Sequence, residues 1–214
     1  MDIYKSKRLQ YIAVESHPKY DDFLHDLFNE PGMVNFTHSI PSGRRRSDTE
    51  ALITSLSSSR LLLMYICLPA DYVPGVIAKD PTPIGVISLT RPAEKMVQHA
   101  NSAMSLLISQ KYQRQGYGTE AITWALDWAF DYARLHRVEL SVYDWNKDAM
   151  RLYVKLGFKD EGVKREALWF KGEWHDMHEM GILEQDWRGR AALREMMSLG
   201  NADEELRRYF KVGA

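Results

Sequence analysis

The feature that most constrains the fold is a glycine-containing turn between an apolar strand and a long amphipathic helix. The strand is expected over 103–109, and the helix from Gly116 to about Leu135. The turn reads Gln113-Arg114-Gln115-Gly116-Tyr117-Gly118-Thr119-Glu120. The first N–H groups of a helix lack intrahelical partners and carry partial positive charge, so such a turn can bind a phosphate. Gly116 and Gly118 would let the backbone approach that phosphate closely.

Charged and amide side chains flank this turn. Lys111 and Arg114 add positive charge, and the amide of Gln113 can hold the turn or bond a phosphate oxygen. The glycine order differs from the Gly-x-Gly-x-x-Gly of dinucleotide folds, and the Gly-Lys-Ser/Thr of a P-loop is missing. On these residues alone, a phosphate site and a turn without any ligand are both open.

The remaining pattern predicts alternating strands and helices. The expected strands are 9–14, 60–68, 84–90, 103–109, 138–143, 163–170 and 174–183. The expected helices are 18–29, 48–57, 116–135 and 147–156. A capping box of Ser47 and Glu50 is expected to start the second helix. This order favours an α/β protein with a mixed, partly parallel sheet and helices on its faces.

Composition narrows the class of protein. The 214 residues are 45% hydrophobic and 27% charged, enough for one sizeable core. The formal net charge of −1 predicts no general attraction to nucleic acid or to anionic membranes. Cys67 is the one cysteine and cannot form an intramolecular disulfide, so a reducing compartment is expected. No segment approaches the roughly 18 apolar residues of a membrane helix, and we expect a soluble, cytoplasmic protein.

Two motifs in sequence order carry a family resemblance. The run Gln113-x-x-Gly116-x-Gly118 resembles the coenzyme A signature of the GCN5-related N-acetyltransferase (GNAT) superfamily. The run Asn146-x-x-Ala149-x-x-Leu152-Tyr153-x-x-Leu156-Gly157-Phe158 is similar to the family's second conserved segment. Further matches, which include Arg8-Leu9 and Gly172-x-Trp174-x-Asp176, resemble the RimJ/RimL-type branch that acetylates N-termini of ribosomal proteins. The resemblance covers about residues 5–187.

The resemblance implies a fold and a domain division. The implied fold is the GNAT fold, in the order β-α-α-β-β-β-α-β-α-β-β, with central parallel strands that splay apart. Those strands would be 103–109 and 138–143. Residues 1–187 would form the acetyltransferase domain, and residues 188–214 are expected to be a C-terminal helical extension.

The resemblance also implies that acetyl-CoA is the co-substrate and lies in the gap between the splayed strands. The pyrophosphate is expected to lie on the turn that comprises Gln113, Arg114, Gln115, Gly116, Tyr117, Gly118 and Thr119. A backbone N–H near Leu107 or Ile108 would polarise the thioester carbonyl. Tyr153 is the expected general acid that protonates the departing thiolate. Asn146 is expected to cap its helix, and also to contact the pantetheine or place Tyr153.

The general base is not evident in the sequence. Family members often carry a glutamate at the start of the first splayed strand, but residues 103–109 contain no acid. His99 could serve, and Ser88 or Ser105 could order a water molecule. The missing acid also leaves room for a non-catalytic member of the family.

The function implied by the resemblance is acetyl transfer to a primary amine by direct attack in a ternary complex. The acceptor could be a protein N-terminus, a polyamine or a small-molecule amine. The alternatives are a non-catalytic acyl-CoA-binding or sensing module and an enzyme that uses a longer acyl-CoA. A homodimer is also open, because the C-terminal helix could pack on a second subunit.

Other polar and aromatic residues have simpler interpretations. His175 and His178 would point to opposite faces of one strand, so no metal site is expected. The run 44–46 is three arginines, read as a solvated loop or as a contact for an acidic acceptor or a CoA phosphate. Trp169, Phe170 and Trp174 flank the final hairpin and could wall the acceptor site.

Overall fold

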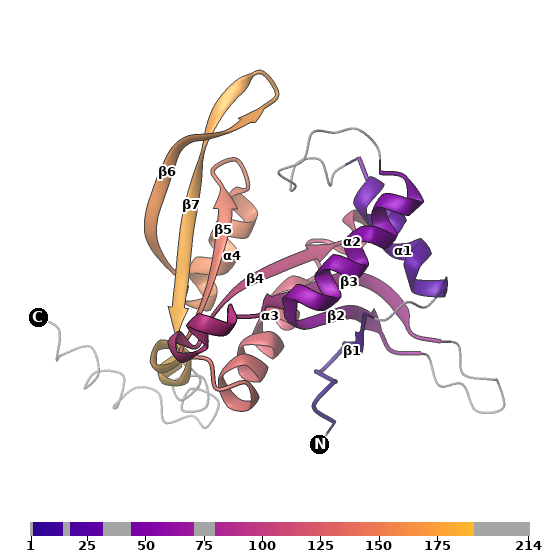
Figure 1. Ribbon diagram of the computed structural model, residues 1–214, viewed down its shortest axis with the longest axis horizontal. Helices are drawn as coiled ribbons and strands as arrows, with labels where there is room; N and C mark the ends of the chain where they lie inside the picture. The colour runs from indigo at the N-terminus through magenta and orange to yellow at the C-terminus, as the bar shows by residue number, and fades with distance from the viewer. Residues whose placement is uncertain (1, 15–17, 32–43, 71–79, 191–214) are drawn as a thin grey trace, which may run out of the picture.

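A seven-stranded sheet with helices on both faces forms the molecule (Figure 1). The computed structural model describes residues 2–14, 18–31, 44–70 and 80–190. The strands are β1 Gln10–Ala13, β2 Arg60–Leu68, β3 Thr82–Thr90, β4 Asn101–Ile108, β5 Arg137–Tyr143, β6 Lys159–Phe170 and β7 Glu173–Leu183. The helices are α1 Pro18–Asn29, α2 Arg46–Ser59, α3 Tyr117–Asp127 and α4 Lys147–Leu156. Short turns of 3₁₀-helix are η2 Glu94–His99 and η3 Gln110–Tyr112, and a π-helical turn is η4 Trp128–Tyr132.

The predicted order of elements is confirmed. The strands are arranged β1-β2-β3-β4-β5-β7-β6, and only the β4–β5 pair is parallel among the described strands. Parallel neighbours require a crossover connection, and here η3, α3 and η4 supply it. No helix among the described residues is long and apolar enough to span a membrane.

Two predicted helix boundaries are wrong. The long helix does not reach Leu135 as α-helix, because α3 ends at Asp127 and continues as the π-helical turn η4. This wider turn keeps Phe130 in the core while the chain bends toward β5. The capping box of Ser47 and Glu50 does not form. Helix α2 begins at Arg46, two residues earlier than expected. Arg45 is the N-cap residue, and its backbone N–H donates to the carboxylate of Asp48.

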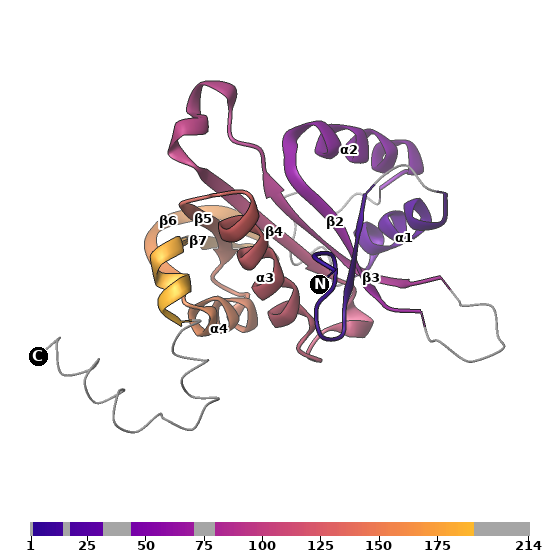
Figure 2. The same cartoon turned by 90° about the horizontal axis from the view of Figure 1, so that it is seen from below.

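The helices pack on opposite faces of the sheet (Figure 2). Helices α1 and α2 cover one face, where Leu24, Leu27 and Ile53 contact Tyr65 and Val86. Helices α3 and α4 cover the other face, over a larger buried cluster. That cluster includes Ile87, Leu89, Met104, Ala121, Ile122, Ala125, Leu126, Val138, Leu140, Val142 and Leu156. Each face is therefore built by alternate residues of the same strands.

The start of the predicted C-terminal extension docks on the domain. Residues 184–190 are helical, and 191–214 lie outside the described residues. Trp187 is buried and donates its indole N–H to Asp127 Oδ1 at 2.8 Å. Arg190 Nη1 donates to the carbonyl of Lys155 at 2.7 Å, which ties the same segment to α4. The division at residue 187 remains a prediction.

The central strands separate after a short parallel contact. The β4–β5 ladder comprises Asn101↔Arg137, Ser102↔Val138 and Ala103↔Glu139. Beyond these pairs β4 stays bonded to β3, and β5 stays bonded to β7. The two halves of the sheet therefore diverge. Past this point, among the described strands, β4 has hydrogen-bonded pairing only with β3, and β5 only with β7.

Gly85 allows β3 to approach the last residues of β4. A Cβ at this position would collide with the carbonyl oxygen of Leu107 and lie 2.8 Å from Cδ1 of Ile108.

We predict that Gly85→Ala lowers the free energy of unfolding by about 1–3 kcal/mol, because overpacking here forces the strands apart. Gly162→Ala is the matched control, since a Cβ there meets no atom within 4 Å. Denaturant unfolding of both variants measures the effect, and equal losses would contradict it.

Candidate active site

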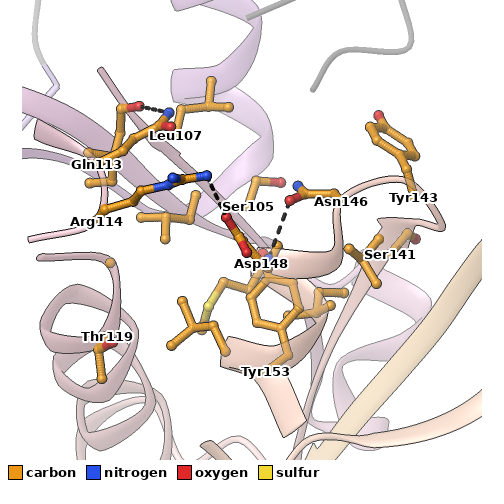
Figure 3. A pocket seen from close by; sticks show the side chains of 18 of the residues that line it. Ser105, Leu107, Gln113, Arg114, Thr119, Ser141, Tyr143, Asn146, Asp148 and Tyr153 are labelled. Atoms are coloured by element: carbon orange, nitrogen blue, oxygen red, sulfur yellow. Dashed lines mark hydrogen bonds and ion pairs between the residues drawn. The ribbon is translucent and has the colours of Figure 1, made fainter. Parts of the chain in front are cut away.

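The gap between the splayed strands is a cavity of about 1000 Å³. Its walls come from β4, the turn before α3, the start of α3, β5 and α4. Figure 3 shows the polar side chains that line it. The lining includes Ser105, Leu107, Ile108, Gln113, Arg114, Gly116, Gly118, Thr119, Ser141, Tyr143, Asn146, Asp148 and Tyr153.

The turn into α3 has the geometry of an anion site. Gly116 caps the helix with φ +82°, a left-handed conformation that favours glycine. Arg114 also has a positive φ, +59°, which turns the chain sharply before the helix. The side chain of Gln113 donates to the carbonyl of Ile108 at 2.9 Å and so holds the turn against the end of β4. The helix N-terminus therefore opens onto the cavity with its free amides.

The N-terminal segment braces this turn from behind. Arg8 Nη1 donates to the carbonyl of Gln115 at 3.0 Å, and its guanidinium lies 4.7 Å from the centre of the Tyr117 ring. Glu120 accepts three bonds, from Ser6 Oγ at 2.7 Å, Arg8 N at 2.6 Å and Arg8 Nε at 2.7 Å. These contacts fix the first turn of α3 to β1's leading segment. They span more than a hundred residues of sequence, so no local pattern indicated them.

Glu30 holds the other side of the turn. Its carboxylate accepts Ser109 Oγ at 2.6 Å and Gln110 N–H at 2.8 Å. Glu30 follows the last residue of α1, so the position of α1 and the start of η3 are coupled.

An ion pair crosses the mouth of the cavity. Arg114 Nη2 lies 3.1 Å from Asp148 Oδ2, with side chains 87% and 62% exposed (Figure 3). Exposed pairs contribute about 0–1 kcal/mol, so a phosphate can replace Asp148 at this guanidinium at little cost. Asp148 comes two residues after the helix cap and was not among the site residues predicted from the sequence.

The register of β4 decides which backbone amides face the gap. The N–H of Ser109 donates to the carbonyl of Ile84 on β3, at 2.9 Å. Amides alternate in direction along a strand, so the N–H of Leu107 also faces β3. The N–H groups of Leu106 and Ile108 face the side from which β5 has diverged. Of the two amides expected to reach the thioester, Ile108 has the required direction.

Helix α4 presents Asn146 and Tyr153 to the cavity. Asn146 Oδ1 accepts the N–H of Ala149 at 3.3 Å and caps the helix, as predicted. Tyr153 lies two turns along, with its ring centre 5.7 Å from that of Phe158. Burial raises the pKa of Tyr153 to about 12, so its hydroxyl is protonated at neutral pH and can donate.

The structure brings together most of the predicted site residues but not all. The predicted members that line the cavity are Leu107, Ile108, Gln113, Arg114, Gly116, Gly118, Thr119, Asn146 and Tyr153. Gln115 and Tyr117 are not in the lining. The side chain of Gln115 donates to the carbonyl of Lys111 at 3.1 Å, and Tyr117 packs under Arg8.

Of the residues predicted to remove the amine proton, some line the cavity and others do not. Ser105 lines the cavity and is exposed to it, whereas Ser88, its neighbour on β3, is 6% exposed. His99 ends η2 and is not in the lining. Among the described lining residues, Asp148 is the one carboxylate, and it lies at the mouth.

An aromatic stack that sequence reasoning missed extends from the cavity to the final hairpin. Tyr143 stacks on Trp145 with ring centres 4.6 Å apart, and Trp145 stacks on Phe170 at the same distance. His175 packs edge-on against Trp145. Its Nδ1 atom lies 3.0 Å from Oδ1 of Asp144. Of the three predicted wall residues, Phe170 joins this stack. Trp169 and Trp174 contact each other and stay 61% and 58% exposed.

The three arginines at 44–46 and the two histidines of β7 contact nearby side chains, and Arg46 is the first residue of α2 rather than part of a loop. Arg44 packs over Phe28, Arg45 pairs with Asp48 and Arg46 pairs with Asp22. His178 bonds Asp160 rather than His175, at 2.8 Å. No group of three or more potential metal-ligating side chains occurs among the residues that the structure describes.

A family model for acetyltransferases of the GNAT family matches residues 46–158, more than half of the sequence. The chain belongs to the acetyltransferase (GNAT) family. The match includes the turn before α3, β4, β5 and α4, which together line the cavity.

Curated relatives match over shorter segments. The probable N-acetyltransferase YjcK of Bacillus subtilis is 32% identical over 109 residues, which are 51% of this chain and 59% of that protein. A spermidine N(1)-acetyltransferase of Vibrio cholerae is 29% identical over 106 residues, 50% of this chain and 61% of the relative. The [ribosomal protein uS5]-alanine N-acetyltransferase of Escherichia coli is 31% identical over 80 residues, 37% of this chain and 41% of the relative. The chain thus spans about 40–60% of the length of these relatives.

Solved structures match the whole fold. The spermidine N-acetyltransferase from Vibrio cholerae in complex with CoA and spermine has a TM-score of 0.70 and 22% identity. The match covers 85% of this chain and 99% of that one. A GNAT-family acetyltransferase from Bacillus anthracis has a TM-score of 0.66 at 21% identity and covers 85% of this chain and 98% of its own. At this identity the likeness establishes the fold.

Glu120 provides a test of the brace behind the phosphate turn. Burial acts to raise the pKa of Glu120, but the hydrogen bonds from Ser6 and Arg8 outweigh it, and the net pKa lies below the ordinary 4.5. The stability from this carboxylate is therefore complete above that value and is lost as the pH falls through the lowered pKa. We predict that Glu120→Gln is destabilised by about 1–3 kcal/mol at pH 7, and that the deficit shrinks on acidification. Urea unfolding at several pH values measures it.

Glu50→Gln, at an exposed site on α2, is the control and should track the native protein at every pH. A Glu120→Gln deficit that stayed constant from neutral to acid pH would contradict the assignment.

Proposed function

We propose that the protein transfers an acetyl group from acetyl-CoA to a primary amine by direct attack in a ternary complex. The observation that carries this proposal is the separation of β4 from β5 after three parallel pairs, around a cavity that begins at the N-terminus of α3 and includes Tyr153. Membership in the GNAT family and the CoA-bound Vibrio structure support acetyl-CoA as the co-substrate.

The turn from Gln113 to Thr119 suits the pyrophosphate. Its helix-terminal amides are unpaired within α3, and Arg114 contributes a guanidinium already exposed at the mouth. The pantetheine arm would lie along the free edge of β4, where an extended amide chain can bond as an added strand. The N–H of Ile108 is then the donor placed to polarise the thioester carbonyl.

Tyr153 is the group proposed to protonate the leaving thiolate. Its pKa of about 12 keeps the phenol protonated over the whole physiological range, which a general acid requires. Asn146 starts the helix that carries Tyr153 and lines the same cavity, so it orients α4 toward the pantetheine.

The relatives suggest the classes of acceptor to test. They include proteins that acetylate spermidine and one that acetylates the alanine of ribosomal protein uS5. Polyamines and protein N-termini are accordingly the first candidates, with simple alkylamines as a third class. One Vibrio structure is described as dodecameric, which supports self-association of this chain.

A second candidate is a non-catalytic acyl-CoA-binding module. It is favoured by the absence of any carboxylate on described β4 residues, where family members often carry a glutamate. This module would bind acetyl-CoA through the same turn and release no thiol with any amine.

The first experiment follows free thiol release from acetyl-CoA with a panel of spermidine, an alanine-initiated peptide and ethylamine. We expect amine-dependent release with at least one acceptor, and acetyl-CoA binding by calorimetry. Binding without release on every amine would support the module. An absence of binding by folded protein would contradict both.

The second experiment tests the general acid. We predict that Tyr153→Phe lowers kcat about 10²-fold with unchanged acetyl-CoA affinity, because a proton donor to the thiolate is lost while the cavity keeps its shape. Tyr132→Phe is the matched control, since Tyr132 is 60% exposed on η4 and outside the cavity. Full turnover by Tyr153→Phe across the pH range would remove the assignment.

A further inference from the structure

A carboxylate outside the cavity is hydrogen-bonded to a serine in its wall. Ser141 on β5 lines the cavity and is exposed to it (Figure 3). Its hydroxyl donates to Glu179 Oε2 on β7 at 2.8 Å. The other carboxylate oxygen, Oε1, accepts Lys164 Nζ at 2.6 Å. Ser141 and Glu179 are direct partners in the β5–β7 register, so the backbone holds this contact in place.

Ser141 lies on the face of the sheet that is opposite to α3 and α4. Leu140 and Val142 belong to the cluster under α3 and α4, so the residue between them points to the other face. On β4, Met104 belongs to the same cluster, and Ser105 therefore shares the face of Ser141. Two exposed hydroxyls thus lie on the two splayed strands, on the side away from the helix that receives the phosphates.

We propose that Ser141 and Glu179 form the route by which the acceptor amine loses its proton. Ser141 contacts the substrate, and Glu179 is a positioning residue that acts through it. This inference rests on the proposed acetyltransferase function and supplies the base that β4 lacks. The carboxylate comes from β7, two strands away from the strand where an acid was sought.

The proton balance is complete. The acceptor arrives as an ammonium ion and gives one proton to Ser141 Oγ, while the Ser141 hydroxyl proton passes to Glu179 Oε2. The neutral nitrogen attacks the thioester carbon, a C–N bond forms and the C–S bond breaks. Tyr153 gives its proton to the thiolate. The proton that remains on nitrogen restores Tyr153 through solvent, and Glu179 returns its proton to solvent.

One cation contacts the Glu179 carboxylate. Lys164 on β6 contacts the carboxylate directly. Arg137 pairs with both Glu139 and Glu161 further along β5, so that group keeps one net negative charge. On the other side of Glu179 along these strands, the neighbouring pair is Tyr143 with Met177, which carries no charge at neutral pH. Lys164 therefore orients the carboxylate so that its other oxygen faces Ser141.

Glu179→Gln and Ser141→Ala test the route through pH profiles of kcat/KM with the best acceptor of the amine panel. We expect each variant to lose about 10²-fold at pH 7, and to approach the native protein at alkaline pH, where the amine deprotonates in solution. The double variant should be no slower than either single variant, because both residues serve one route. Acetyl-CoA affinity and KM for acetyl-CoA should stay unchanged.

A weakly basic acceptor separates proton transfer from a structural role. With 2,2,2-trifluoroethylamine, which is neutral at pH 7, the variants should match the native rate, whereas with ethylamine they should not. Glu139→Gln is the matched control, because Glu139 is on the same strand and face but outside the lining. Lys164→Met should lower kcat/KM with ethylamine, since it removes the contact that orients the Glu179 carboxylate toward Ser141.

The outcomes are separable. Native-like activity of Glu179→Gln at pH 7, or a pH-independent loss equal for both amines, overturns the proton route and leaves the acetyltransferase proposal intact. Failure of the native protein to acetylate any amine overturns both.

Discussion

The limited parallel contact between β4 and β5 is the constraint on which the site depends. Three residue pairs join the strands at one end, and each strand then follows its own antiparallel neighbour. Backbone groups on the free edge of β4 therefore lack a neighbouring strand. Such groups can hydrogen-bond another strand or an extended ligand. The cavity therefore combines apolar walls from two half-sheets with a row of unpaired amides, which suits an extended, amide-bearing co-substrate.

The anion site at α3 is held in place from three directions. Gln113 bonds the end of β4, Glu30 bonds the start of η3, and Arg8 with Glu120 braces the first helical turn. A helix terminus contributes only a partial charge, so its value to a ligand depends on amides that need not rearrange on binding. The N-terminal segment and the end of α1 supply that rigidity, although neither contacts the expected position of the phosphates.

The proposed acid and base differ in their environments as well as in residue type. Tyr153 lies on the face of the helices and is kept protonated by burial, which raises its pKa to about 12. Glu179 lies on the opposite face of the sheet, where it pairs with Lys164 and accepts a hydrogen bond from Ser141. The two candidate proton-transfer groups are thus separated by the thickness of the sheet, with the thioester gap between them. In the proposed reaction, this arrangement would let the co-substrate and the acceptor approach from different faces of the sheet.

A family resemblance implied the splayed strands and the candidacy of Tyr153. The sequence by itself determined the order of strands and helices, the glycine turn at Gly116 and the cap at Asn146. These depend on local periodicity, on a residue that must adopt positive φ and on side chains a few positions apart in one helix. The tertiary structure alone decided the pair Ala103↔Glu139 after which β4 and β5 separate, the brace from Arg8 to Glu120 and the contact of Ser141 with Glu179. Each of these joins residues 36 to 112 positions apart, and strand register and packing, which no local pattern specifies, bring such residues together.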